Sequence, residues 1–181
     1  SEVKPVEPRR MWPDIEAAAQ AAGHRHPVGA AQARRRIRAV ANPLRLGQMG
    51  EHPLVLEQHW TVHFGRQHAA EGGPVTVGKL RQWMDRPTAM GLPREVQNLL
   101  ILAWATMTNR RFLHNGGPAD ASIDQMPDGL ELVEQALPSS EHWALAVQRA
   151  AVLFGSTLPQ KLSAAHVARA AQDLRQAVRA R

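Results

Sequence analysis

The chain has 181 residues, a formal net charge of +6 and an apolar fraction of 44%, so it is long enough to bury the core of one globular domain. It contains no cysteine, which excludes disulfides, thiolate chemistry and cysteine-ligated metals. It has no apolar run of membrane-spanning length and no apolar signal segment near its start, so we expect a cytoplasmic protein without a membrane partner.

The positive charge is concentrated at the two ends of the sequence. Residues 1–50 hold nine Lys or Arg against four acids, and residues 151–181 hold five against one. Residues 101–150 hold three against six and are therefore slightly acidic. This distribution would let the ends contact nucleic acid and leaves the middle for other contacts.

Residues 1–26 are expected to form an N-terminal arm and a short helix. Residues 1–10 carry two prolines and no apolar period, which indicates a linker or arm. A helix is predicted from Met11 to Ala22, followed by a turn at His24–Pro27. We expect residues 27–181 to form a single helical domain.

The strongest basic feature lies between Pro27 and Leu46, where the sequence reads QARRRIRAVANPLRL. Ile37, Val40 and Leu44 define the packing face of a predicted helix, which Pro43 ends or kinks at the preceding residue. Guanidinium groups on the other sides suit phosphate oxygens. The candidate nucleic-acid ligands here are Arg34, Arg35, Arg36, Arg38 and Arg45. The same pattern also fits a solvated helix face or a salt-bridged contact with the acidic middle.

The next predicted helix runs from Leu54 to Ala70, after a turn at 47–53. His59 and His63 on this helix have the i, i+4 spacing that allows two imidazoles to bind one metal. Neither a glutamate base nor a third ligand accompanies them, so we expect no metal site.

The segment GGPVTVGKL, residues 72–80, is similar to a P-loop. A nucleotide-binding P-loop needs Ser or Thr after its lysine, and here Leu80 follows Lys79. We therefore expect Thr76 to cap a helix that ends near Asp85, without ATP binding.

The most apolar helix is predicted between Pro93 and Phe112, and its apolar stripe nearly encircles it. Past this helix, residues 110–114 and 130–136 are candidate strands of an antiparallel ribbon. The order of elements predicts a winged-helix-like core at about 54–155. The expected fold class is mainly α, a helical domain with this core and a small two-stranded antiparallel β-ribbon.

Two further helices are predicted at the C-terminal end. Ser139 is placed to cap the first helix, and Gly155 closes it. The second starts at Ser163 and carries three more candidate nucleic-acid ligands, Arg169, Arg175 and Arg179.

The sequence contains no nucleophile elbow, HExxH, complete P-loop or dinucleotide fingerprint. Asp120, Asp124 and Asp128 recur in a Gly/Pro loop without the ligand spacing of an EF-hand. We therefore expect no enzymatic activity, no cofactor and no metal.

Three blocks of the chain resemble a region of the PglY-type phage-resistance ATPases of phage growth limitation and BREX defence systems. These blocks are ANPLRLGQMGEHPLVL, VGKLRQWMDRPTAMGLPREVQNLLILAWATMTNRRF and ELVEQALPSSEHWALAVQRAAVLFG, within roughly residues 30–155. The resemblance implies a non-catalytic module of a defence ATPase whose ATP site lies elsewhere. It also implies methyltransferase and phosphatase-like partners that act on DNA.

The first functional hypothesis is a module that binds double-stranded DNA through its basic helices or organises other phage-defence proteins. The alternative is a protein-interaction or scaffold domain with no nucleic-acid role. A third hypothesis is a metal-dependent enzyme that uses His59, His63 and a further ligand.

Overall fold

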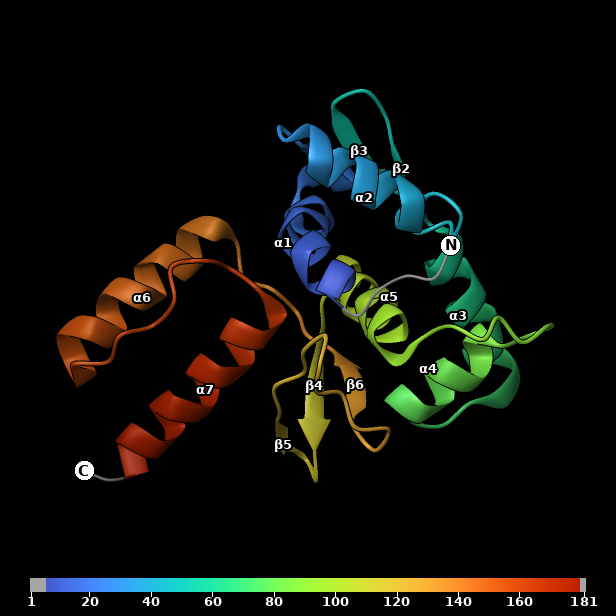
Figure 1. Ribbon diagram of the computed structural model, residues 1–181. Helices are drawn as coiled ribbons and strands as arrows, with labels where there is room; N and C mark the ends of the chain where they lie inside the picture. The colour runs from blue at the N-terminus through green and yellow to red at the C-terminus, as the bar shows by residue number, and fades with distance from the viewer. Residues whose placement is uncertain (1–5, 180–181) are drawn as a thin grey trace.

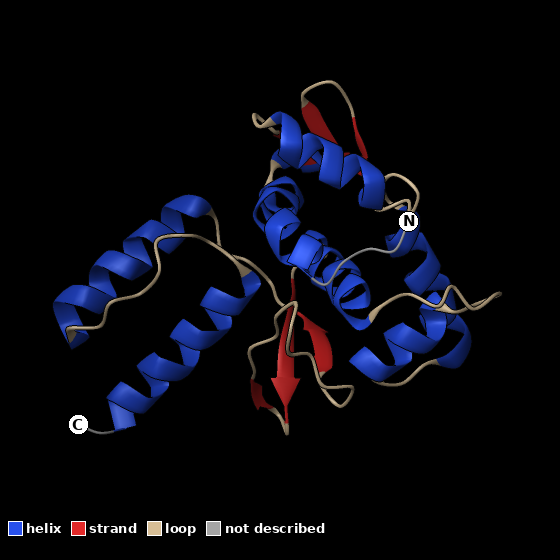
Figure 2. Ribbon diagram, viewed as in Figure 1, coloured by secondary structure: helices blue, strands red, loops and turns tan. Residues whose placement is uncertain are grey.

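The computed structural model describes residues 6–179, and its elements form a mainly α-helical protein with two small antiparallel sheets, as predicted for the fold class (Figure 2). The first half contains, in chain order, α1 (Val6–Gln20), the short 3-10 helix η1 (Ala22–His24), β1 (Arg25–Pro27), α2 (Ala31–Ala41), β2 (Gly47–Met49), β3 (Pro53–Leu56) and α3 (His59–Glu71). The second half contains α4 (Val77–Met84), α5 (Arg94–Met107), β4 (Arg110–His114), β5 (Gly117–Pro118), β6 (Glu131–Glu134), α6 (Ser140–Phe154) and α7 (Ala164–Arg179).

The first helix begins earlier than the sequence indicates. It starts at Val6, so much of the predicted arm is helical, while residues 1–5 of that arm lie outside the described part of the chain. Pro8 is compatible with this start because a helix does not need the N–H groups of its first turn. Met11 and Ile15 of α1 are buried in the same core as α2 and α5. The prediction that residues 1–26 form an arm and a short helix apart from a domain of residues 27–181 stays a prediction.

A three-stranded sheet of order β1-β3-β2 was not predicted, and it replaces two predicted turns and the start of a predicted helix. Leu54 and Leu56 face the core while Pro53 and Val55 are half-buried, which is the two-residue period of a strand. Four residues are too few to separate this period from a helical one in the sequence. Gly47 allows the pairing, because a Cβ atom there would lie 2.7 Å from the carbonyl oxygen of Val55.

The predicted caps and ends of four helices are confirmed. The Oγ1 atom of Thr76 accepts a hydrogen bond from the backbone N–H of Lys79 at 3.2 Å, and Ser139 accepts one from His142 at 3.2 Å. Helix α2 ends at Ala41, as predicted for this position, although Asn42 before Pro43 keeps helical dihedral angles, with φ of −64° and ψ of −54°. Gly155 closes α6 with a left-handed φ of 63°, and Ser163 Oγ caps the first turn of α7.

The predicted ribbon of β4 and β6 forms with Arg111 opposite Val133, and β5 adds a third strand. The segment between α3 and α4 also joins β6, because the N–H of Leu132 donates to the oxygen of Val75 at 2.8 Å. Thr76 bridges Glu131 in the same place. The order is therefore α3, the bridge at Thr76, α4, α5 and the ribbon of β4 and β6. This order is consistent with the winged-helix interpretation, which stays a prediction.

Helices α6 and α7 form a hairpin with a hydrophobic cluster of their own, around Trp143, Val147 and Ala170. In Figure 1 this hairpin stands to one side of α1–α5, next to the strands β4 and β5 that α7 contacts. Within the described residues, two ion pairs join it to the rest of the chain. The Nζ atom of Lys161 lies 3.4 Å from Glu16 Oε2, and Arg169 Nη1 lies 3.3 Å from Asp120 Oδ2.

Candidate functional site

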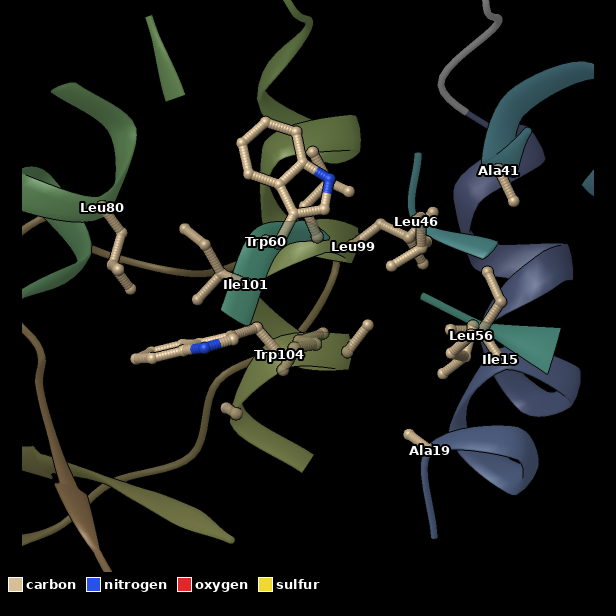
Figure 3. Close-up of a cluster of buried hydrophobic side chains, with 14 of the residues drawn as sticks. Ile15, Ala19, Ala41, Leu46, Leu56, Trp60, Leu80, Leu99, Ile101 and Trp104 are labelled. Carbon is tan, nitrogen blue, oxygen red and sulfur yellow. The ribbon is translucent and has the colours of Figure 1, made fainter. Parts of the chain in front are cut away.

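In the winged-helix interpretation α5 would be the recognition helix, but it offers no polar surface for reading bases. Val96 and every residue from Asn98 to Ala105 are buried. Figure 3 shows Leu99 directed toward Ile15 of α1, while Ile101 extends toward Leu80 of α4. A DNA-reading winged helix presents polar and basic residues of this helix to the major groove. Because α1 packs along α5, that route to base recognition is closed.

Two of the candidate arginines on α2 hold neighbouring turns in place. The Nη1 atom of Arg34 donates to the carbonyl oxygen of Val28 at 2.9 Å and also to that of Gly29. Arg38 donates through Nη2 to the oxygen of Gly50 at 2.7 Å and through Nε to that of Met49 at 3.2 Å. These guanidinium groups therefore have structural acceptors, which reduces the donors that remain for phosphate.

Two other candidates are paired with acids. Arg45 Nε lies 3.9 Å from Glu57 Oε2, and Arg45 has a left-handed φ of 53°, which is uncommon for a residue with a Cβ atom. Arg169 is paired with Asp120, as described above, in an exposed contact between the hairpin and the loop after β5. Arg169 thus contacts the acidic middle, a contact that the sequence suggested only for the arginines between Pro27 and Leu46.

Four candidate arginines have no side-chain hydrogen bond or ion pair within residues 6–179. Arg35 and Arg36 lie on α2, and Arg175 and Arg179 lie near the end of α7. Arg36 is half-buried and the other three are exposed. Figure 1 places α2 and α7 at opposite ends of the molecule. The two basic helices thus do not converge on one surface.

The histidines of α3 are engaged with each other and with the core. The rings of His59 and His63 stack with centroids 6.2 Å apart, and His63 Nε2 lies 2.6 Å from the carbonyl oxygen of Trp83. Burial lowers the pKa of His59, and the charges of Arg45 and His63 lower it further. No group of three or more potential metal ligands occurs among the described residues.

A buried polar network was missed by the sequence reasoning. Arg81 is 8% exposed, and its Nη2 atom donates to Asn98 Oδ1 at 2.6 Å and to the oxygen of Met126 at 3.0 Å. The Nδ2 atom of Asn98 donates to the oxygen of Ile123 at 2.7 Å. These contacts attach the long connection between β5 and β6 to α4 and α5. The sequence contains one indication of this network, because Arg81 lies within the apolar stripe of α4 and Asn98 lies within that of α5.

The P-loop-like segment is also structural. Its lysine, Lys79, donates through Nζ to the carbonyl oxygen of Gly72 at 3.1 Å. Gly78 lies against the loop that precedes β6, where its N–H donates to the oxygen of Asp128 at 2.9 Å. The lysine thus closes the turn between α3 and α4.

The hairpin carries exposed apolar side chains on both of its helices. Leu145, Val152, Leu153 and Val178 are 41%, 78%, 57% and 60% exposed. A groove of about 340 Å³ lies between α6 and α7 and is lined in part by His142, Leu145, Ala146, Arg149, Leu153 and Leu174. We call this the hairpin groove. Exposed apolar surface of this kind marks sites of protein contact when it is contiguous.

A larger hollow of about 740 Å³ lies where α1, the end of α5 and the start of α7 meet. Trp12, Met107 and Phe112 contribute apolar lining, and Arg9 pairs with Asp124 at its edge across 2.6 Å.

No helix among the described residues is long and apolar enough to cross a membrane.

The structure thus defines a small helical module with a strand ribbon, a covered central helix and an exposed hairpin groove. The family described as "BREX System ATPase PglY protein 5th domain" matches residues 7–105, which is more than half of the chain. The chain belongs to this family and is a module of the phage-defence ATPase type, as the resemblance implied. The match includes α1 and ends within α5, so the ribbon and the hairpin lie beyond it. No solved structure matches the chain.

Proposed function

We propose that this domain is a non-catalytic module that organises partner proteins of the defence system around its ATPase in the cytoplasm. The observation that carries the proposal is the burial of α5. A helix whose surface is covered by α1 and α4 has no face left for base reading. The exposed apolar side chains of α6 and α7 instead offer a surface suited to protein contact.

The test is pairwise binding between the 181-residue chain and the other purified proteins of its defence system, followed by light scattering or interferometry. The samples are treated with nuclease so that DNA cannot bridge two proteins. We expect at least one component to bind directly under these conditions. If no component binds while the chain retains its fold, the proposal is wrong.

A second candidate function is sequence-independent contact with the DNA backbone. It is favoured by Arg35 and Arg36 of α2, whose side chains have no hydrogen bond or ion pair within residues 6–179. Such contacts release counterions, so affinity falls with salt by a slope of about 0.9 per phosphate.

This candidate is tested by titrating the chain with duplex DNA at several salt concentrations. Replacing Arg35 and Arg36 by Gln should weaken binding to all duplexes alike and reduce the salt slope by about one per lost phosphate contact. A second variant that replaces Arg175 and Arg179 on the distant α7 shows whether that helix contributes to the same binding. Absence of binding at low salt would eliminate the DNA function for this domain.

A further inference from the structure

The hairpin groove combines an apolar floor with a positive charge. Its described lining includes Leu145, Leu153 and Leu174, and its one charged residue of fixed sign is Arg149. On α6 these positions follow helical spacing, because residues 142, 145, 146, 149 and 153 fall on one side of the helix. The groove therefore runs along the hairpin and is shaped to receive an elongated apolar ridge.

The lining of the groove contains an arginine and no acid. Helices α6 and α7 carry Arg149, Arg169, Arg175 and Arg179 against only Glu141 and Asp173. Arg169 is already paired with Asp120, and neither acid of the two helices lines the groove. Arg149, Arg175 and Arg179 have no ion pair within the described residues, so their charge is available to a ligand.

From these observations we infer that the hairpin groove binds an acidic amphipathic helix of a partner protein. The partner's apolar residues would recur at i, i+3, i+4 and i+7 and fill the groove, which is the helix-in-groove mode of recognition. Its Glu and Asp residues would flank that stripe and lie beside Arg149. Helix α6, with 15 residues, is about 22 Å long, so the partner segment would have roughly four turns.

A second copy of this chain fits the surface less well. A twofold interface places the same patch of each subunit against the other. Two hairpin grooves in contact would then bring the two copies of Arg149 together with no acid in either lining, which is unfavourable. Complementary charge thus selects an acidic partner.

The inference rests on the proposed partner-organising function and names the site and the chemistry of the partner. Its test uses two synthetic helical peptides of about 18 residues with the same leucine stripe. One has Glu at the flanking positions and the other has Lys. Binding to the 181-residue chain is measured by fluorescence anisotropy, and the contact site is mapped by backbone amide shifts.

We expect the acidic peptide to bind at least about tenfold more tightly than the basic peptide, with amide shifts confined to α6 and α7. Arg149→Glu should reverse or abolish this preference. Because Arg149 is exposed, that variant should fold normally, and its circular dichroism spectrum provides the control. Leu145→Lys should weaken both peptides by blocking the apolar floor.

Equal binding of both peptides, binding of neither, or shifts on other elements would overturn the inference. Self-association that Leu145→Lys abolishes would also overturn it, because a second copy would then occupy the groove. These results are separate from the test of the proposed function. A defence protein that binds the chain when neither peptide does leaves that function intact and places the contact elsewhere.

Discussion

The Nη2 atom of Arg81 donates to Asn98 Oδ1 across 2.6 Å inside the core, and this contact joins α4 to α5. Burial lowers the pKa of Arg81, as does the nearby charge of Arg94, while Asp128 at 3.2 Å opposes both effects. The arginine is thus held by an amide, a backbone carbonyl and a carboxylate at the edge of the core. This contact, the apolar core, the ion pairs of Asp128 and the helix caps each lead to a prediction about stability.

Asn98→Leu is expected to destabilise the fold by about 1–3 kcal/mol, because it leaves the Arg81 guanidinium and the Ile123 carbonyl without their buried partner. Urea denaturation measures the loss. The double variant Arg81→Met with Asn98→Leu should recover part of it, since no buried charge then lacks a partner. Strictly additive losses in the double variant would mean that the two side chains do not act together.

Leu100→Ala should lower the free energy of unfolding by about 2–5 kcal/mol, because Leu100 is 0% exposed and its removal leaves a cavity. Thermal and urea unfolding give the value. Val152→Ala is the matched control, since Val152 is 78% exposed and its truncation should change stability by less than about 0.5 kcal/mol. Comparable effects of the two substitutions would contradict the buried position of α5.

Asp128→Asn should reduce the loss of stability in acid. A hydrogen bond from Arg94 holds the pKa of Asp128 below its ordinary value, and the charges of Arg81 and Arg94 act in the same direction. The unfolded chain therefore binds this proton at a higher pH than the folded chain. The stabilisation is present above the unfolded value of about 3.9 and disappears as the pH falls through the lower folded value.

The measurement is the free energy of unfolding from neutral pH down to strongly acidic pH in both proteins. Asp128→Asn should show a shallower decline below about pH 4 than the parent chain. Asp173→Asn, on the exposed side of α7, serves as the control for an Asp-to-Asn change away from Arg94. A parallel decline in parent and Asp128→Asn would show that Arg94 does not favour the charged carboxylate.

Removing the helix caps should have moderate and local effects. Thr76→Ala and Ser139→Ala each delete an acceptor for a first-turn N–H, at a cost of about 1 kcal/mol. Hydrogen exchange should show faster exchange at Lys79 or His142 in the respective variant. Replacing the same residues by Asp should preserve protection, since Asp also caps helices. If alanine leaves protection unchanged, the caps do not stabilise these helices.

Local patterns in the sequence were sufficient for much of the fold. The stripe of α5, the caps at Thr76 and Ser139 and the pairing of β4 with β6 all depend on neighbouring residues or on strong periodicity. The sheet β1-β3-β2 was missed because its strands have only three or four residues. Strands this short do not repeat often enough to reveal their period.

The arrangement of the candidate site could not be predicted in the same way. Arg34 and Arg38 looked available for phosphate, but their acceptors are backbone carbonyls of adjacent turns whose shape the sequence does not show. The Arg81–Asn98 contact depends on how two helices pack. The exposure of Leu145, Val152 and Leu153 on α6 could not be predicted from the sequence. These apolar residues continue around the helix beyond its inward stripe, so the pattern does not show which of them face solvent.

The packing of α1 on α5 has a consequence for synthesis of the protein. Helix α1 leaves the ribosome before α5, and the helix that covers it is completed only at Met107. Until then Met11 and Ile15 are exposed to solvent, and the contact that buries them closes a long loop, which slows folding. A nascent chain shorter than α5 would therefore present an apolar helix that chaperones can bind.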